Sequence, residues 1–223
     1  MESQIRILLS DHQSLVRQGI QRLLEDDPGF VVVGEAASGD ETVDLAACLH
    51  PDVVLLDLNL PGIGSLEAIR RLRRACPSCG ILAMTTEVSD PFPGRLLEVG
   101  ASGYLTKHCD IEEIVKAIRA VAGGERYISA DIAREMALSM LPGGEQSPFD
   151  RLSQREMQVM IMVTQGQSVH AISDKLCLSP KTVSTYRYRL YDKLGVDNDV
   201  ELTHLALRHG ILEPTPPRGD VPG

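Results

Sequence analysis

The first half of the chain alternates between short apolar runs and segments with helical periodicity, and this pattern constrains the fold more than any other feature. The apolar runs lie at residues 5–9, 31–33, 53–56, 81–84 and 104–105. The helical segments lie at about 14–25, 40–49, 64–75, 92–99 and 111–122. Such β/α repeats with short connections predict a doubly wound sheet of five parallel strands, covered by helices on both faces.

The second half has helical periodicity only. Ser153 is followed three residues later by Glu156, which is the spacing of a capping box at a helix N-terminus. Ser179 and Pro180 suit the N-cap and the first position of a later helix. We expect four helices, two of them joined by the tight turn "CLSP", and this is the helix-turn-helix arrangement.

Between the halves, Gly143, Gly144 and Pro148 would break any regular element, so a flexible joint is expected at 141–149. The expected fold class is α/β plus all-α. The expected parts are an α/β domain at 1–123, a linker with a short helix at 124–149, a helical domain at 150–212 and a disordered tail at 213–223.

Charge is distributed unevenly between the two halves. The chain has a net charge of −9, with −10 in residues 1–150 and +1 in residues 151–223. Within 174–194, five basic residues stand against two acidic ones, which indicates a surface that faces a polyanion. These basic residues are Lys175, Lys181, Arg187, Arg189 and Lys193.

The sequence has neither a run of about 18 apolar residues nor a basic and apolar signal segment at its start, so we expect no membrane contact and a cytoplasmic location. The five cysteines include the pair Cys76 and Cys79, but their spacing fits neither a zinc ribbon nor a disulfide framework. A reduced chain fits this cysteine usage.

Functional side chains follow the predicted strands at the points where those strands end. Asp11 follows the first strand, Asp57 ends the third, Thr85 ends the fourth and Lys107 follows the fifth. Because the carboxyl ends of parallel strands meet at one edge of a sheet, we expect these side chains to converge. Two carboxylates can bind Mg2+, and one can attack phosphorus while a cation and a hydroxyl stabilise the phosphoryl oxygens. Each residue alone has an ordinary structural explanation, so the prediction depends on the joint arrangement.

The stretches "PDVVLLDLNLPG" and "GASGYLTK", together with Thr85, resemble the flavodoxin-like receiver domain of bacterial two-component response regulators. The resemblance implies that Asp57 accepts a phosphoryl group from a sensor histidine kinase. It implies a Mg2+ ion held by the acidic pocket, with Asp11, Asp57 and the backbone carbonyl of Asn59 as ligands. It also implies that Thr85 and Tyr104 act as switch residues.

The stretches "LSQREMQVM", "ISDKLCLSPKTVSTYRYRLYDKLGV" and "DVELTHLALRHG" resemble the DNA-binding domain of the LuxR/NarL/FixJ class. Short polar side chains and an aromatic can contact base edges, while the cations bind phosphates. Arg187 lies on the core side of its helix, where its stem could pack while its head reaches a phosphate. The expected DNA-binding residues are Lys175, Lys181, Thr182, Ser184, Thr185, Arg187, Tyr188, Arg189 and Lys193.

The chain to about residue 213 further resembles the GacA/UvrY global regulators, through the stretches "DPFPGRLLEVGA", "RYIS", "SPFD" and "LCLSPKTV". This resemblance implies transcriptional control of small regulatory RNA genes. We expect an active homodimer bound to double-stranded promoter DNA at an inverted repeat, because dimers of this kind recognise two half-sites.

One position departs from the receiver pattern, which normally reads Asp-Asp-His after the first strand. Here the chain reads Ser10, Asp11, His12. Without a gap, His12 replaces the second acid; with a local shift, Ser10 replaces the first acid instead. The spacing from Ile5 to Leu15 favours the alignment without a gap. Either way one carboxylate is missing, so we expect weaker Mg2+ binding and slower phosphorylation, with His12 as a candidate metal ligand.

Two other functions remain open from the sequence. The missing acid also suits a phosphorylation-independent transcription factor with an altered receiver pocket. A phosphohydrolase would use a similar set of Asp, Thr and Lys, but such enzymes usually carry another acid near the nucleophile and a cap over the substrate. Position 59 is Asn and no cap is inserted, so we expect that the protein is not an enzyme.

Overall fold

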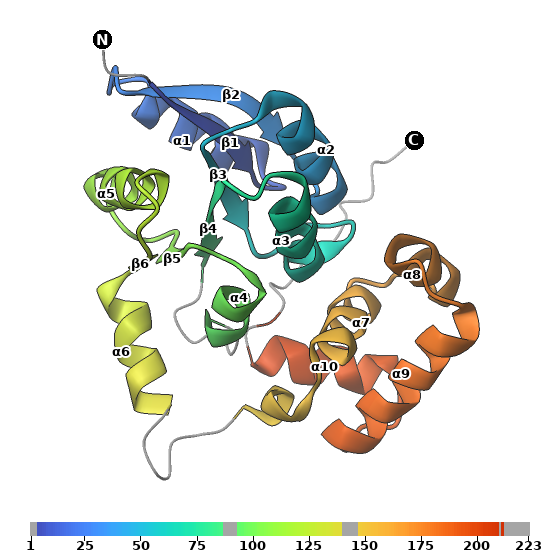
Figure 1. The fold of residues 1–223 in the computed structure, drawn as a ribbon. Helices are drawn as coiled ribbons and strands as arrows, with labels where there is room; N and C mark the ends of the chain where they lie inside the picture. Colours follow the sequence, from blue (N-terminus) through green and yellow to red (C-terminus); the bar gives the residue numbers. More distant parts are fainter. Residues whose placement is uncertain (1–3, 87–92, 140–146, 210, 212–223) are drawn as a thin grey trace, which may run out of the picture.

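A parallel β-sheet forms the centre of the N-terminal half (Figure 1). The computed structural model describes residues 4–86, 93–139, 147–209 and 211, so the tail predicted at 213–223 and part of the joint predicted at 141–149 lie outside the described residues. The strands are β1 (Ile5–Ser10), β2 (Phe30–Ala36), β3 (Val53–Asp57), β4 (Gly80–Thr85), β5 (Gly103–Thr106) and β6 (Tyr127–Ile128). Their order across the sheet is β2-β1-β3-β4-β5-β6.

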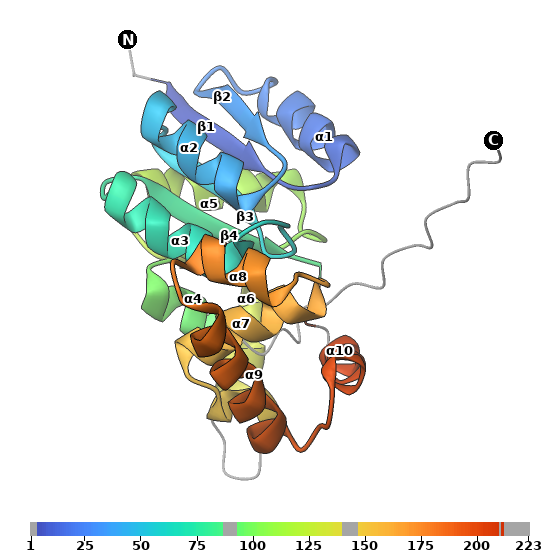
Figure 2. The ribbon, with the colours of Figure 1, turned by 90° about the vertical axis from the view of Figure 1, so that its right-hand side faces the viewer.

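Helices cover both faces of the sheet (Figures 1 and 2). One face packs against α1 (Ser14–Leu24) and α5 (Ile111–Ala122), and the other packs against α2 (Gly39–Leu49), α3 (Gly64–Ala75) and α4 (Pro93–Val99). Within β3, Val53 and Leu55 join the first of these cores, whereas Val54 and Leu56 join the second. Because both faces are buried, each strand reads as a continuous apolar run.

The prediction of five strands is wrong by one. β6 extends the sheet beyond β5, where the backbone N–H of Tyr127 donates to the carbonyl of Ser102 at 3.1 Å and that of Ser129 to the carbonyl of Tyr104 at 3.0 Å. A two-residue strand carries too little sequence for its periodicity to be recognised. The following helix, α6 (Ala130–Ser139), packs against β5 and α4. The described part of the predicted linker therefore continues the edge of the sheet.

The C-terminal half is helical, as predicted. Its elements are the 3-10 turn η1 (Pro148–Arg151) and the helices α7 (Gln154–Thr164), α8 (Val169–Leu176), α9 (Pro180–Leu194) and α10 (Asp199–Arg208). The capping box at Ser153 is confirmed, since its hydroxyl accepts from the N–H of Glu156 and its own N–H donates to the Glu156 carboxylate. The N-cap at Ser179 is also confirmed. Cys177, at φ 52°, makes the sharp turn between α8 and α9.

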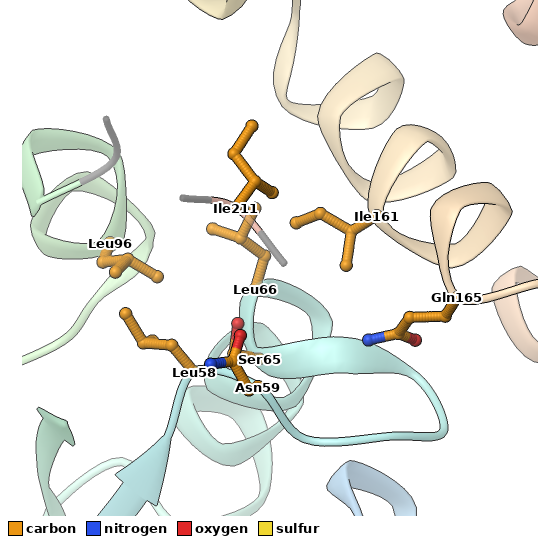
Figure 3. Close-up of a pocket in the computed structure, with 8 residues that line it drawn as sticks. All are labelled: Leu58, Asn59, Ser65, Leu66, Leu96, Ile161, Gln165 and Ile211. Atoms are coloured by element: carbon orange, nitrogen blue, oxygen red, sulfur yellow. The ribbon is translucent and has the colours of Figure 1, made fainter. Parts of the chain in front are cut away.

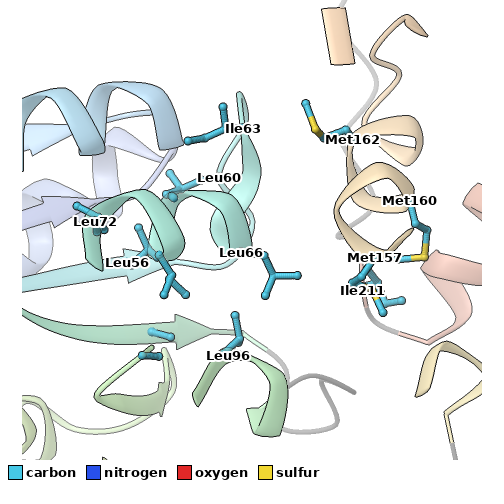
Figure 4. Close-up of a cluster of buried hydrophobic side chains, with 14 of the residues drawn as sticks. Leu56, Leu60, Ile63, Leu66, Leu72, Leu96, Met157, Met160, Met162 and Ile211 are labelled. Carbon is cyan, nitrogen blue, oxygen red and sulfur yellow. The ribbon is translucent and has the colours of Figure 1, made fainter. Parts of the chain in front are cut away.

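The two halves pack against each other through α3 and α7. An apolar cluster runs between them, and Figure 4 shows Leu66 and Leu96 on the sheet side facing Met157 and Ile211 on the helical side. All four side chains are buried. The carboxyl edge of the sheet therefore lies close to the helical domain. A structural change at the strand ends could thus alter the contact with that domain.

Candidate functional site

The predicted strand-end residues meet at the carboxyl edge of the sheet. β1, β3, β4 and β5 are successive neighbours, so their ends lie side by side. Asp11 and Asp57 are 5% and 1% exposed, which is rare for carboxylates unless they are paired. Thr85 is buried at the end of β4, and its carbonyl accepts the backbone N–H of Lys107 at 2.6 Å. This bond fixes the start of the segment that carries the lysine.

Lys107 joins the two carboxylates. Its Nζ lies 2.7 Å from Oδ2 of Asp11 and 2.9 Å from Oδ1 of Asp57. The backbone N–H of Gln13 donates to the other oxygen of Asp11 at 2.8 Å, and the N–H of Asn59 donates to Oδ1 of Asp57 at 3.1 Å. Lys107 and these backbone N–H groups thus offset part of the negative charge of the two buried carboxylates.

His12 points into the pocket. Its Nδ1 lies 3.0 Å from Oδ2 of Asp57 and 3.7 Å from Oδ1 of Asp11. Ser10 instead turns away, because its hydroxyl is hydrogen-bonded to the hydroxyl of Thr42 on α2. Asp11 and His12 therefore occupy the pocket, and this placement agrees with the alignment without a gap, in which His12 replaces the second acid.

The ionisable groups of the pocket shift one another's pKa values toward their charged forms. The hydrogen bond to Asp57 raises the pKa of His12 above its usual value. Burial alone would raise the pKa of Asp57, but His12 and Lys107 outweigh burial and the pKa is lowered. Burial alone would lower the pKa of Lys107, but the two carboxylates outweigh it and the pKa is raised. Asp57 is therefore an ionised carboxylate at neutral pH, as a nucleophile must be.

The remaining residues predicted for the receiver site are Tyr104 and Asn59. The ring of Tyr104, in β5, is fully buried and packs in the core that also contains Ala83 of β4. Asn59 follows β3 and lines a small cavity between the two halves (Figure 3). The cavity volume is about 30 Å³, which holds one or two waters but no small-molecule ligand.

The loop between Asp57 and α3 contacts the helical domain directly. The side-chain amide of Gln165 donates to the carbonyl of Leu60 at 3.3 Å, and that of Gln167 donates to the carbonyl of Gly62 at 2.8 Å. In Figure 3, Gln165 extends from α7 toward this loop. The segment that carries Asp57 is thus hydrogen-bonded to the neighbouring domain.

The exposed side of α9 carries most of the predicted DNA-binding residues. Lys181, Thr185, Tyr188 and Arg189 are exposed, and Tyr188 is 73% exposed. The partly buried residues Thr182 and Ser184 lie beside them, near the N-terminus of the helix. A helix surface with cations around short polar side chains and an aromatic fits the major groove of DNA.

The other three predicted DNA-binding cations contact protein groups in this structure. The guanidinium of Arg187 pairs with Asp199 of α10 and lies 3.1 Å from the Tyr191 hydroxyl. Nζ of Lys193 lies 2.7 Å from Oε2 of Glu156, and Nζ of Lys175 lies 3.1 Å from Oε1 of Gln167. The cationic groups of these three residues therefore contact protein acceptors in this structure.

Glu67 is a contact residue that sequence analysis missed. It is 7% exposed at the α3–α7 contact, where the Gln158 amide donates to it at 2.8 Å. Arg70, Arg71 and Arg155 pair with the same carboxylate at 3.3, 3.1 and 3.5 Å. The spacing of the two α3 arginines indicates helical ion pairs, but the sequence carries no sign that this face meets another domain.

The pair Cys76 and Cys79 lies in the connection between α3 and β4. Cys76 and Cys79 are free and buried, and burial raises the pKa of the Cys79 thiol to about 12. The Cys79 thiol is therefore protonated and a poor nucleophile at neutral pH. Among the described residues, the one group of three potential metal ligands is Asp11, His12 and Asp57. No helix in the described part of the chain has the length and apolar character that a bilayer span requires.

Two family models match the two halves. The response regulator receiver domain matches residues 7–119, and the luxR family of bacterial regulatory proteins matches residues 150–206. The chain is a DNA-binding two-component response regulator. Receiver domains generally bind Mg2+ at this acidic pocket and receive phosphate from histidine kinases, and LuxR-type domains bind DNA.

Named response regulators are similar to this chain over nearly its whole length. The response regulator GacA of Pseudomonas viridiflava is 53% identical over 210 residues, which cover 94% of this chain and 98% of that protein. The response regulator UvrY of Escherichia coli is 50% identical over 208 residues, which cover 93% and 95%. The chain is thus a regulator of the GacA/UvrY type, and the alternative of a phosphorylation-independent factor is not favoured.

Solved structures agree with the two-domain fold. RcsB of Salmonella enterica serovar Typhimurium, bound to the rprA promoter in the presence of phosphomimetic BeF3−, matches with a TM-score of 0.71 and 25% identity. The match covers 91% of this chain and 98% of that one. The response regulator ChrA of a heme-sensing two-component system matches with a TM-score of 0.52 and 28% identity over 95% of this chain and 100% of that one.

Proposed function

We propose that Asp57 is the phosphoacceptor of this response regulator and that a sensor histidine kinase is the donor. The supporting observation is a buried carboxylate that is kept ionised between Lys107 and His12. In the transfer, an Asp57 oxygen forms a bond to phosphorus as the bond to the kinase histidine breaks, and the imidazole leaves. Lys107 and Thr85 then contact the phosphoryl oxygens, and Tyr104 responds to the shift of Thr85.

The pocket fits a divalent cation only in part. Asp11, Asp57 and the backbone carbonyl of Asn59 would hold Mg2+, which neutralises charge on the phosphoryl oxygens when bound. His12 supplies a nitrogen where the receiver pattern has a second carboxylate. Because Mg2+ prefers oxygen ligands, we expect weaker Mg2+ binding and slower phosphorylation than in a pocket with two acids.

The DNA-binding role belongs to α9. Its exposed residues would enter the major groove, and dimers would recognise an inverted repeat in promoter DNA. The relationship to GacA and UvrY supports a role in the transcription of small regulatory RNA genes. On this proposal the protein acts in the cytoplasm and is not an enzyme. We place the receiver at 1–123, the linker at 124–149 and the DNA-binding domain at 150–212.

Phosphorylation of the full chain tests this function. Incubation with a small-molecule phosphodonor and Mg2+ should add one phosphoryl group to the wild type and none to Asp57→Asn, as measured by intact mass. Phosphorylated protein should bind promoter DNA more tightly than the untreated form. Equal labelling of Asp57→Asn, or DNA binding that ignores the phosphodonor, would overturn the proposal.

A further inference from the structure

The donor set of the pocket differs from that of a magnesium site. Asp11, His12 and Asp57 each offer one ligand atom, and these atoms lie within 4.8 Å of one another. Two of the donors are carboxylate oxygens and the third is an imidazole nitrogen. From this set we infer that the pocket selects a first-row transition ion, of the Mn2+ to Zn2+ series, over Mg2+.

The geometry leaves three donors on one side of the pocket. Lys107 contacts Oδ2 of Asp11 and Oδ1 of Asp57. The opposite oxygens, Oδ1 of Asp11 and Oδ2 of Asp57, are the ones that approach Nδ1 of His12, at 3.7 and 3.0 Å. The lysine therefore neutralises one oxygen of each carboxylate and leaves the other oxygen beside the imidazole.

These separations suit a coordination shell. Ligands bound at about 2.0–2.2 Å in tetrahedral or octahedral geometry lie roughly 3–3.5 Å from one another. The distances of 3.0 and 3.7 Å from the His12 nitrogen bracket this range, so small side-chain movements would complete a site. An ion between them would take the place of the hydrogen bond between His12 and Asp57.

Ligand chemistry then sets the choice of ion. Mg2+ requires near-octahedral oxygen ligands and gives up its waters reluctantly. Imidazole suits zinc, copper, iron and nickel, and affinity for nitrogen-containing sites rises along the first-row series. The His12 side chain is 36% exposed, so this third donor lies at the solvent end of the pocket. The inference deepens the proposed function, because it names the cation class of the same pocket.

Ion binding to the full chain tests the inference. Mn2+ binding is followed by loss of the free-ion electron paramagnetic resonance signal, and Co2+ binding by its visible spectrum. We expect the wild type to bind both ions at least tenfold more tightly than His12→Ala. His12→Asp restores the second acid, so it should gain at least tenfold in Mg2+ affinity. His170→Ala, at an exposed position in α8, is the matched control and should bind like the wild type.

Several results would overturn the inference. One is Mg2+ affinity in the wild type equal to that of His12→Asp. Another is Mn2+ and Co2+ binding that survives His12→Ala. A third is a thiolate charge-transfer band in the Co2+ spectrum, which would assign the ion to cysteines.

Phosphodonor labelling of the same proteins separates the two proposals. Absence of labelling in both the wild type and His12→Asp overturns the phosphoacceptor role, whereas normal labelling with failed Mn2+ and Co2+ binding overturns the ion selectivity alone.

Discussion

At the scale of single residues, Lys107 is the cation that pairs with both carboxylates of the receiver pocket. Its Nζ is within 2.9 Å of both buried carboxylates. Removal of one partner from a buried ion pair typically costs about 3–5 kcal/mol. Because His12 remains as a partial partner of Asp57, we expect Lys107→Met to lower the free energy of unfolding by about 2–4 kcal/mol, measured by urea denaturation. Lys116→Met, exposed on α5, should change it by less than about 0.5 kcal/mol. Equal losses in the two variants would contradict this account.

The convergence of Asp11, Asp57 and Lys107 was predictable because strand order alone brings the ends of parallel strands together. Side-chain direction was not. Nothing in the sequence decides whether His12 turns toward Asp57 or toward solvent, since both orientations are open to a residue just beyond a strand. In the same way, net basic charge does not reveal that Arg187 is directed at Asp199.

At the scale of elements, the capping box of α7 should make stability depend on pH. Burial alone would raise the pKa of Glu156, but hydrogen bonds from Lys193 and Ser153 outweigh it and the pKa is lowered. The ionised carboxylate therefore stabilises the fold above its ordinary pKa of 4.5, and this stabilisation is lost as pH falls through the lower folded value.

The measurement is the difference in unfolding free energy between the wild type and Glu156→Gln across pH. The difference should be constant near neutral pH and should shrink below about pH 4.5. The pair formed by the wild type and Glu135→Gln, at an exposed position on α6, should show no such change. A difference for Glu156→Gln that grows on acidification would have the wrong sign for this mechanism.

The exposed face of α9 gives a second prediction at this scale. If Lys181 and Arg189 contact phosphates, each replacement by Ala should weaken DNA binding and reduce the slope of log affinity against log salt by about 0.9. Thr185→Ala should instead change the preference among sequences with little effect on the slope. Arg134→Ala, exposed on α6, is the charge-matched control. If the salt-dependence slopes of all four variants were equal, Lys181 and Arg189 of α9 would not contact phosphates.

Element boundaries followed closely from periodicity, with 64–75 and 111–122 reproduced as α3 and α5. β6 was not predicted, because it forms only by pairing with the edge of β5. The local sequence of a two-residue segment carries no information about that tertiary contact. Periodicity detects a face that is buried along several turns, but a single pair of backbone hydrogen bonds leaves no such pattern.

At the scale of the whole molecule, the contact between domains was not predictable. Leu66 of α3 and Met157 of α7 are apolar residues in amphipathic helices, and each is explained equally well by the core of its own domain. Only the folded arrangement shows that they belong to a shared cluster. The polar part of that contact depends on Glu67, whose burial converts an ordinary helical ion pair into a bridge between α3 and α7.

We therefore expect Glu67→Gln to loosen the contact between the domains. Gln preserves the shape and can still accept from Gln158, but three guanidinium groups lose their carboxylate. Loss of a buried charge partner should cost at least about 1.4 kcal/mol, which is a tenfold change in equilibrium. Hydrogen exchange of α7 amides should accelerate by about that factor, and small-angle scattering should show a larger radius of gyration. Glu98→Gln, exposed on α4, should leave both unchanged. If Glu67→Gln exchanged and scattered like the wild type, apolar packing alone would hold the domains together.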